Sequence, residues 1–265
     1  MSCNKVVPYY FLIIVIIVAS STKSGATSNS ISDTSVVNSI LKEAKVALDS
    51  NKIAEAFRLS SLAYKKSSGL NYVYGKAKSL AYIGNIQAIK GSKDSSLIIY
   101  KKAYLLFEQE NNQFEVGNIL NSIGTVFRDI GNQDTAEYYY SKALAIRQKV
   151  NDKLGIPQTI HNLGLVYSAR GIYPKALEYL LYSLSLLEEN GDKIQLAKIL
   201  NNIGIVFWNQ GNSAKALEYF FKSLKVKEEI NDIKGAAYIY NNIGLIYQNS
   251  GDYLLALKYH NESLR

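Results

Sequence analysis

The feature that most constrains this chain is a short motif that returns every 40 residues. The tetrapeptides AYIG, NSIG, HNLG, NNIG and NNIG end at glycines 40 residues apart, namely Gly84, Gly124, Gly164, Gly204 and Gly244. A second glycine follows each of them after seven residues, and in most repeats an alanine follows five residues later. Self-similarity at a fixed period indicates a solenoid or array, in which each unit packs against its neighbours.

Each repeat contains the pattern of two helices. In the repeat around Gly204, apolar residues recur at helical spacing up to Gly211, and the pattern resumes from Ala216 to Asn231. Gly and Asn tolerate the left-handed conformation found just past a helix end. We therefore expect an all-α solenoid of about six helix-turn-helix units. Its first helices should end before Asn51, Gly91, Gly131, Gly171, Gly211 and Gly251, and its second helices before Asn71, Asn111, Asn151, Gly191 and Asn231.

The glycines at the ends of the tetrapeptides fall inside the expected first helices. Each costs about 1 kcal/mol of helix stability relative to alanine. That cost is reasonable if two helices cross at the glycine too closely for a β-carbon. We expect the alanine twelve residues later, such as Ala216 after Gly204, to be the opposing small residue.

This pattern resembles the tetratricopeptide repeat, in which an aliphatic residue and glycine are followed by an aromatic residue, a second glycine and an alanine. The residues that carry it are Leu163, Gly164, Tyr167, Gly171, Ala176 and Leu180, and then Ile203, Gly204, Phe207, Gly211, Ala216 and Phe220. The usual repeat has about 34 residues. The longer form is similar to repeats of the partner-of-inscuteable group, kinesin light chain and exported bacterial sensor proteins. The resemblance covers roughly residues 36–265 and implies a right-handed superhelix with a concave groove lined by the first helices.

The N-terminus differs in composition from the repeats. Residues 6–19 form an apolar run that is too short to cross a bilayer, which needs about 20 residues, and has the length of a signal-peptide core. We expect residues 1–26 to be a signal peptide or an uncleaved membrane anchor. Residues 27–35 are rich in Ser and Thr and are expected to form a flexible linker. The array then occupies 36–265, with repeats at 36–70, 71–110, 111–150, 151–190, 191–230 and a truncated 231–265.

The groove positions of the family can be transferred to this chain one by one. They lie six, three and two residues before each mid-helix glycine, and four and five residues after it. The resemblance thereby assigns partner binding to Asn118, Asn121, Arg128, Gln158, His161, Asn162, Lys198, Asn201, Asn202, Trp208, Asn209, Tyr238, Asn241, Asn242, Gln248 and Asn249.

Two of these assignments leave alternatives open. Asparagine is a mediocre helix former, so its return in mid-helix calls for a cause. The amides could form a ladder along an extended peptide backbone, because each offers donors and an acceptor. They could instead bond to neighbouring helices and hold the repeats in register, or simply reflect an Asn-rich chain. Likewise Trp208, the single tryptophan, could anchor a ligand side chain or pack against an adjacent first helix.

Composition argues against chemistry. The chain has one cysteine, Cys3, and two histidines, so a cysteine-based metal site is excluded and little remains for a general base. We expect no catalytic residue, no metal and no cofactor. The net charge of +8 comes from scattered lysines with no stripe on one helix face, which argues against nucleic acid as a partner. The family's carboxylate clamp is absent, because Asn85 fits one role but Ala81 replaces the lysine.

These observations predict an exported, non-enzymatic scaffold that binds a peptide or protein in its groove. Membrane contact would occur only through the N-terminal segment or a missing C-terminal part. The alternative is the extracytoplasmic input region of a larger signalling protein, such as a histidine kinase, nucleotide cyclase or transcription regulator. The resemblance to exported bacterial sensor proteins implies that alternative. The last expected helix stops midway at Arg265 with no polar cap, which indicates either a fragment of a longer protein or an end covered by a partner.

Overall fold

The computed structural model describes residues 26–264, and within them the chain forms twelve helices and no strand. The predicted signal segment at residues 6–19 lies outside the described residues. The helices are α1 (Ala26–Asp49), α2 (Ile53–Gly69), α3 (Val73–Ile89), α4 (Lys93–Gln109), α5 (Gln113–Asp129), α6 (Gln133–Lys149), α7 (Gly155–Ala169), α8 (Tyr173–Asn190), α9 (Lys193–Asn209), α10 (Ser213–Glu229), α11 (Ile233–Asn249) and α12 (Tyr253–Ser263).

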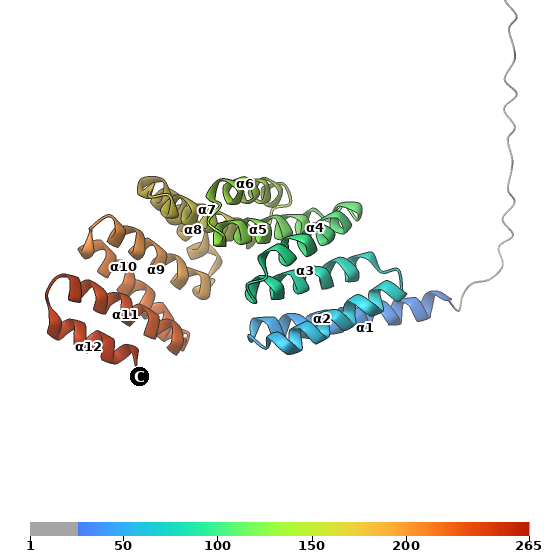
Figure 1. The fold of residues 1–265 in the computed structure, drawn as a ribbon, viewed down its shortest axis with the longest axis horizontal. Helices are drawn as coiled ribbons and strands as arrows, with labels where there is room; N and C mark the ends of the chain where they lie inside the picture. The colour runs from blue at the N-terminus through green and yellow to red at the C-terminus, as the bar shows by residue number, and fades with distance from the viewer. Residues whose placement is uncertain (1–25, 265) are drawn as a thin grey trace, which may run out of the picture.

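The helices pack as six consecutive pairs. Each odd-numbered helix contacts the helix that follows it, and each pair contacts the next. Figure 1 shows that the pairs follow one another along an arch, with the N-terminal and C-terminal pairs facing each other across its open side. The apolar core is divided along the arch into clusters shared between neighbouring helices. This is the solenoid expected from the repeat.

The helix ends lie where the sequence predicts. All eleven predicted stop residues have positive φ, from Asn111 at 52° to Gly131 at 84°. Pro174 stands at the first positions of α8, where no backbone N–H is needed. Several helices begin with an Asn or Asp whose side chain accepts a hydrogen bond from the backbone N–H three residues later, which satisfies a free donor of the first turn. These are Asn112, Asn132, Asp192, Asn212, Asp232 and Asp252.

Two features differ from the expectation. Helix α1 begins at Ala26, so residues 27–35 are helical rather than a linker. This segment contains no Pro and no Gly, so nothing in it breaks a helix that continues toward the N-terminus. No helix within residues 26–264 is both long and apolar enough to span a membrane.

The mid-helix glycines do mark close helix crossings, but the opposing residue is not chiefly the alanine. A β-carbon placed on Gly204 would lie 2.7 Å from the ring of Phe220, and 3.2 Å from the carbonyl oxygen of Ala216. The same contact pairs Gly84 with Tyr100 and Gly124 with Tyr140. A large side chain of the second helix thus lies directly against the glycine of the first helix, sixteen residues earlier in the sequence.

Candidate functional site

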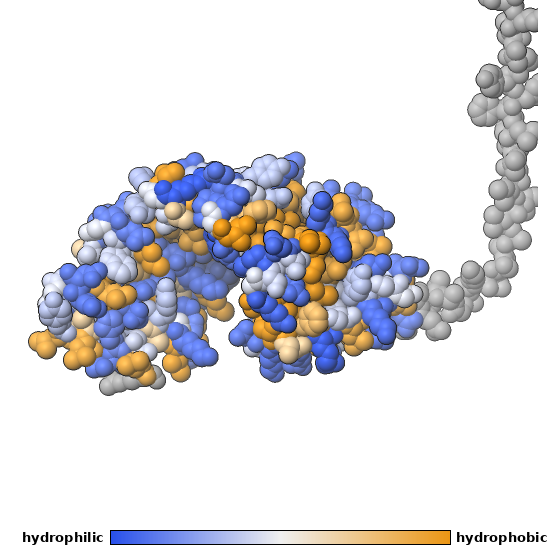
Figure 2. All heavy atoms as spheres, viewed as in Figure 1, coloured by the Kyte–Doolittle hydropathy of each residue, from blue (hydrophilic) through white to orange (hydrophobic). Residues whose placement is uncertain are grey.

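A cavity of about 640 Å³ lies against the first helices of the N-terminal half, and we call it the groove cavity. Figure 2 shows the molecule as an arch that is hollowed between its two arms. The cavity is lined by Lys45, Leu48, Asp49, Tyr82, Asn85, Ala88, Ile89, Lys93, Tyr100, Asn121, Ser122, Thr125, Val126, Asp129 and Gln158. Most of these residues come from α1, α3, α5 and α7, so consecutive first helices form one wall.

The groove cavity contains only part of the predicted set. Asn121 and Gln158 line it, whereas the other predicted residues do not. The prediction began at Asn118 and so missed the lining residues of α1 and α3. The signal was present in the sequence, because Tyr82 stands two residues before Gly84, in a position already assigned to the groove.

The predicted asparagines bond to one another between repeats. Asn162 Nδ2 donates to Asn121 Oδ1 at 3.1 Å, and Asn242 Nδ2 donates to Asn201 Oδ1 at 3.1 Å. His161 Nε2 and Asn202 Nδ2 are 2.7 Å apart. Each bond joins the residue three before one glycine to the residue two before the next glycine. The amides were expected either to bind a peptide backbone or to bond to neighbouring helices. These hydrogen bonds support the second interpretation, in which the amides hold the repeats in register.

Other predicted residues are left without a partner. Gln158, Lys198 and Tyr238 occupy the same position in three successive repeats and are exposed. None of them makes a hydrogen bond or ion pair within residues 26–264. The same holds for Asn209, Asn241, Gln248 and Asn249. These side chains are available to a ligand without breaking an internal contact.

Asn118 belongs to a buried polar cluster that the sequence did not reveal. Arg147, which is 2% exposed, donates to Asn118 Oδ1 at 2.8 Å and to Gly155 O at 2.7 Å. Its Nε lies 3.4 Å from Asp152 Oδ2. Asn118 in turn donates to Glu115 at 3.1 Å. Phe107 and Leu187 stand where Arg147 stands in the neighbouring repeats. Two repeats on, Lys227 is buried at the equivalent position and pairs with Asp232 at 2.6 Å, so a cation with an aspartate five residues later was the available signal.

His161, which takes part in these hydrogen bonds between repeats, has a lowered pKa. Burial, with the nearby charges of Arg128 and Lys198, lowers the pKa of His161 to about 4. The side chain is therefore neutral at pH 7. With Asn202 Nδ2 as donor, Nε2 is the ring nitrogen that accepts. Arg128 also donates to Asn162 at 3.3 Å, and it pairs with Asp129 at 3.0 Å.

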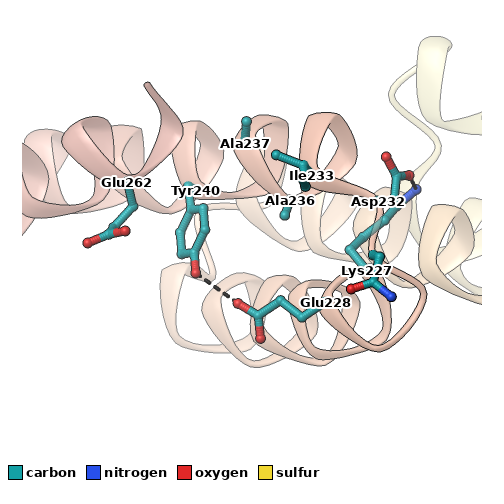
Figure 3. Close-up of a pocket in the computed structure, with 9 residues that line it drawn as sticks. Lys227, Glu228, Asp232, Ile233, Ala236, Ala237, Tyr240 and Glu262 are labelled. Atoms are coloured by element: carbon teal, nitrogen blue, oxygen red, sulfur yellow. Dashed lines mark hydrogen bonds and ion pairs between the residues drawn. The ribbon is translucent and has the colours of Figure 1, made fainter. Parts of the chain in front are cut away.

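Trp208 is half-buried and packs against the core cluster of the C-terminal repeats. Its contacts favour the packing interpretation over a ligand anchor. A second, smaller cavity of about 360 Å³ lies between α10, α11 and α12. Figure 3 shows Tyr240 directed at Glu228, to which its hydroxyl donates at 2.8 Å, with Glu262 nearby. Within residues 26–264 no three His, Cys, Asp or Glu side chains are grouped to hold a metal ion.

Comparison with known proteins is consistent with this architecture. Three family models, each described as a tetratricopeptide repeat, match residues 116–153, 155–229 and 237–265, and together cover more than half of the chain. No curated protein matches the sequence significantly.

Solved structures are similar at low identity. BtubC (BKLC) from P. vanneervenii has a TM-score of 0.69 at 15% identity, over 80% of this chain and 90% of that chain. A Rap protein complexed with competence and sporulation factor has a TM-score of 0.66 at 16% identity, over 87% and 76%. The STAND protein PH0952 from Pyrococcus horikoshii, which has a tetratricopeptide repeat sensor, has a TM-score of 0.70 at 18% identity, over 87% and 34%. At these identities the likeness shows the fold. Repeat period, helix pairing, family matches and fold agree, and the chain belongs to the tetratricopeptide repeat family.

Proposed function

We propose that this protein is a non-catalytic scaffold that holds an extended peptide, or an extended segment of a partner protein, along its first helices. The observation that carries the proposal is the groove cavity, which is open, lined by consecutive first helices and mixed in polarity. Its apolar residues include Ile89, which is 57% exposed. Such a surface can bury side chains of a ligand while polar groups bond its backbone.

The internal hydrogen bonds support this role indirectly. A solenoid whose repeats are joined by Asn121–Asn162 and Asn201–Asn242 keeps its first helices at a fixed spacing. Ligand binding then costs less in ordering, because the groove is already formed. From Gln158, which lines the cavity, the unpartnered Lys198 and Tyr238 repeat the same position in the next two repeats and so extend this surface beyond the cavity.

The comparisons add support of a general kind. Proteins of this repeat family serve as protein-interaction scaffolds, and one solved structure of similar fold is a complex with competence and sporulation factor. We extend this to a peptide or protein partner for the present chain.

A displayed library of random peptides provides the test. Peptides selected on the full chain should bind wild type and lose most of their affinity for a Gln158→Ala, Lys198→Ala, Tyr238→Ala triple variant. Tyr182→Ala is the matched control, because Tyr182 is 55% exposed on a second helix and Tyr238 is 56% exposed on a first helix. The proposal fails if no peptide is selected, or if the control and the triple variant lose affinity equally.

We further propose that the protein is exported, on the strength of the apolar run at residues 6–19 and the small residues that follow it. Mass spectrometry of protein expressed with its own N-terminus should find it outside the cytoplasm, either shortened by removal of a segment ending near Ala26 or intact and bound to the membrane. Recovery of the full-length chain in the cytoplasmic fraction would contradict export.

A further inference from the structure

Two tyrosines of second helices bond to residues that line the groove cavity, and one of them, Tyr100, also lines it. Tyr100 of α4 and Tyr140 of α6 are almost completely buried, at 2% and 0% exposed. Their rings lie against Gly84 and Gly124, where a β-carbon on either glycine would clash with the ring. Because the glycines leave this room, each hydroxyl reaches past the first helix to a residue that lines the cavity.

The two hydroxyls have different effects. Tyr100 donates to Asn85 Oδ1 at 2.6 Å, and Tyr140 donates to Thr125 Oγ1 at 3.0 Å. Burial raises the pKa of both tyrosines, so both keep the proton that they donate. Thr125 already donates its own hydroxyl proton to Asn121 O at 3.1 Å. Asn85 makes no other hydrogen bond within the described chain, so its oxygen is occupied and its amide nitrogen is left for a ligand.

On the adjacent first helix, α5, the side-chain amide of Asn121 is oriented in the same way as that of Asn85. Asn121 Oδ1 accepts from Asn162 Nδ2, so the amide nitrogen of Asn121 is also the unused end. Both Asn85 and Asn121 line the groove cavity. Two neighbouring helices therefore offer N–H donors there, and a fitting ligand must bring acceptors. The backbone carbonyls of an extended peptide are such acceptors, and they are present whatever the peptide sequence.

We propose that Tyr100 is a positioning residue of the groove, which fixes the Asn85 amide with its N–H groups toward the ligand and so selects for carbonyl acceptors at this point. The inference rests on the proposed peptide-binding function. It is specific to the N-terminal half, because the equivalent residues further along are Leu180, Phe220 and His260, none of which has a hydroxyl. Phe220 is fully buried in its repeat, so the fold accommodates phenylalanine at this position.

The experiment uses Tyr100→Phe in the full chain, with Tyr140→Phe as the matched control. Both variants lose one buried hydroxyl beside a glycine, but only Tyr100→Phe frees an amide oxygen. In the ligand-free protein, the side-chain amide resonances of Asn85 should shift and exchange faster in Tyr100→Phe and stay unchanged in Tyr140→Phe. A peptide selected on wild type should bind Tyr100→Phe about fivefold more weakly, the effect of one hydrogen bond.

A double-variant comparison separates positioning from general destabilisation. If Tyr100 acts through Asn85, then Tyr100→Phe has no further effect on peptide affinity in an Asn85→Ala background. Equal loss in both backgrounds, unchanged affinity in Tyr100→Phe, or unchanged Asn85 amide resonances would each overturn the inference. If no peptide is selected at all, the proposed function fails, and the amide resonances still decide whether Tyr100 fixes Asn85.

Discussion

Acidification from pH 7 to pH 5 should weaken the centre of the array through one residue, His161. Burial and the charges of Arg128 and Lys198 lower the pKa of this histidine from its ordinary value of 6.5 to about 4. Between these two values the unfolded chain binds more protons than the folded chain, so the free energy of unfolding falls as the pH falls. The stabilisation is complete above pH 6.5 and is lost as the pH falls toward 4.

The magnitude follows from the two pKa values. Their difference corresponds to about 3 kcal/mol at the acid limit, and about 2 kcal/mol of it is lost between pH 7 and pH 5. The chain supplies its own control, because Asn121, Asn201 and Asn241 occupy the equivalent position in other repeats. His161→Asn should keep a hydrogen-bonding partner for Asn202 without a group that titrates in this range.

The assay is urea unfolding, followed by circular dichroism, of wild type and His161→Asn at both pH values. Wild type should lose about 2 kcal/mol more than the variant on acidification. Hydrogen exchange should locate the loss in α7 and α9, because stability in a repeat array is distributed among units and their interfaces. The reasoning is refuted if the two proteins lose the same stability between pH 7 and pH 5.

Three further perturbations test the packing. Gly204→Leu should destabilise by about 3 kcal/mol through overpacking, whereas Gly211→Ala, with φ of 77° and open space around it, should cost about 1 kcal/mol; melting curves that rank them in reverse would exclude a close crossing. Arg147→Leu should cost about 3 kcal/mol in urea unfolding, because it leaves a buried carboxylate unpaired; an unchanged transition would show that the cluster contributes nothing. Asn242→Ala should cost about 1 kcal/mol and Asn241→Ala almost nothing, since only Asn242 bonds across repeats; equal effects would count against the register role.

The repeat pattern was sufficient to predict the fold. The residues that end helices, such as Asn111 and Gly131, are chosen for a backbone conformation, and this requirement is local enough to read from the sequence. The mid-helix glycines also predicted close crossings, because a costly residue in a helix needs a packing reason. The residues that pack against these glycines, such as Phe220, were not predicted. The crossing geometry of the two helices determines which residue of the second helix reaches the glycine.

The site was predicted only in part. The register identified groove positions such as Asn121 and Gln158, but not the partners that the side chains choose there. Asn121 and Asn162 lie 41 residues apart, and their hydrogen bond depends on how one repeat is rotated on the next. Arg147 was missed for a related reason. Its partners are the carboxylate of Asp152 between α6 and α7, the carbonyl of Gly155 on α7 and the amide of Asn118 on α5, and only the packing of α5 against α6 and α7 brings the three together.

The most direct test of the account is the location of a bound peptide. A peptide selected on the full chain and labelled with a nitroxide should broaden amide resonances of α3, α5 and α7, including those of Asn85 and Thr125, and leave Tyr182 on α8 unaffected. Broadening confined to second helices would contradict the claim that the first helices form the binding surface.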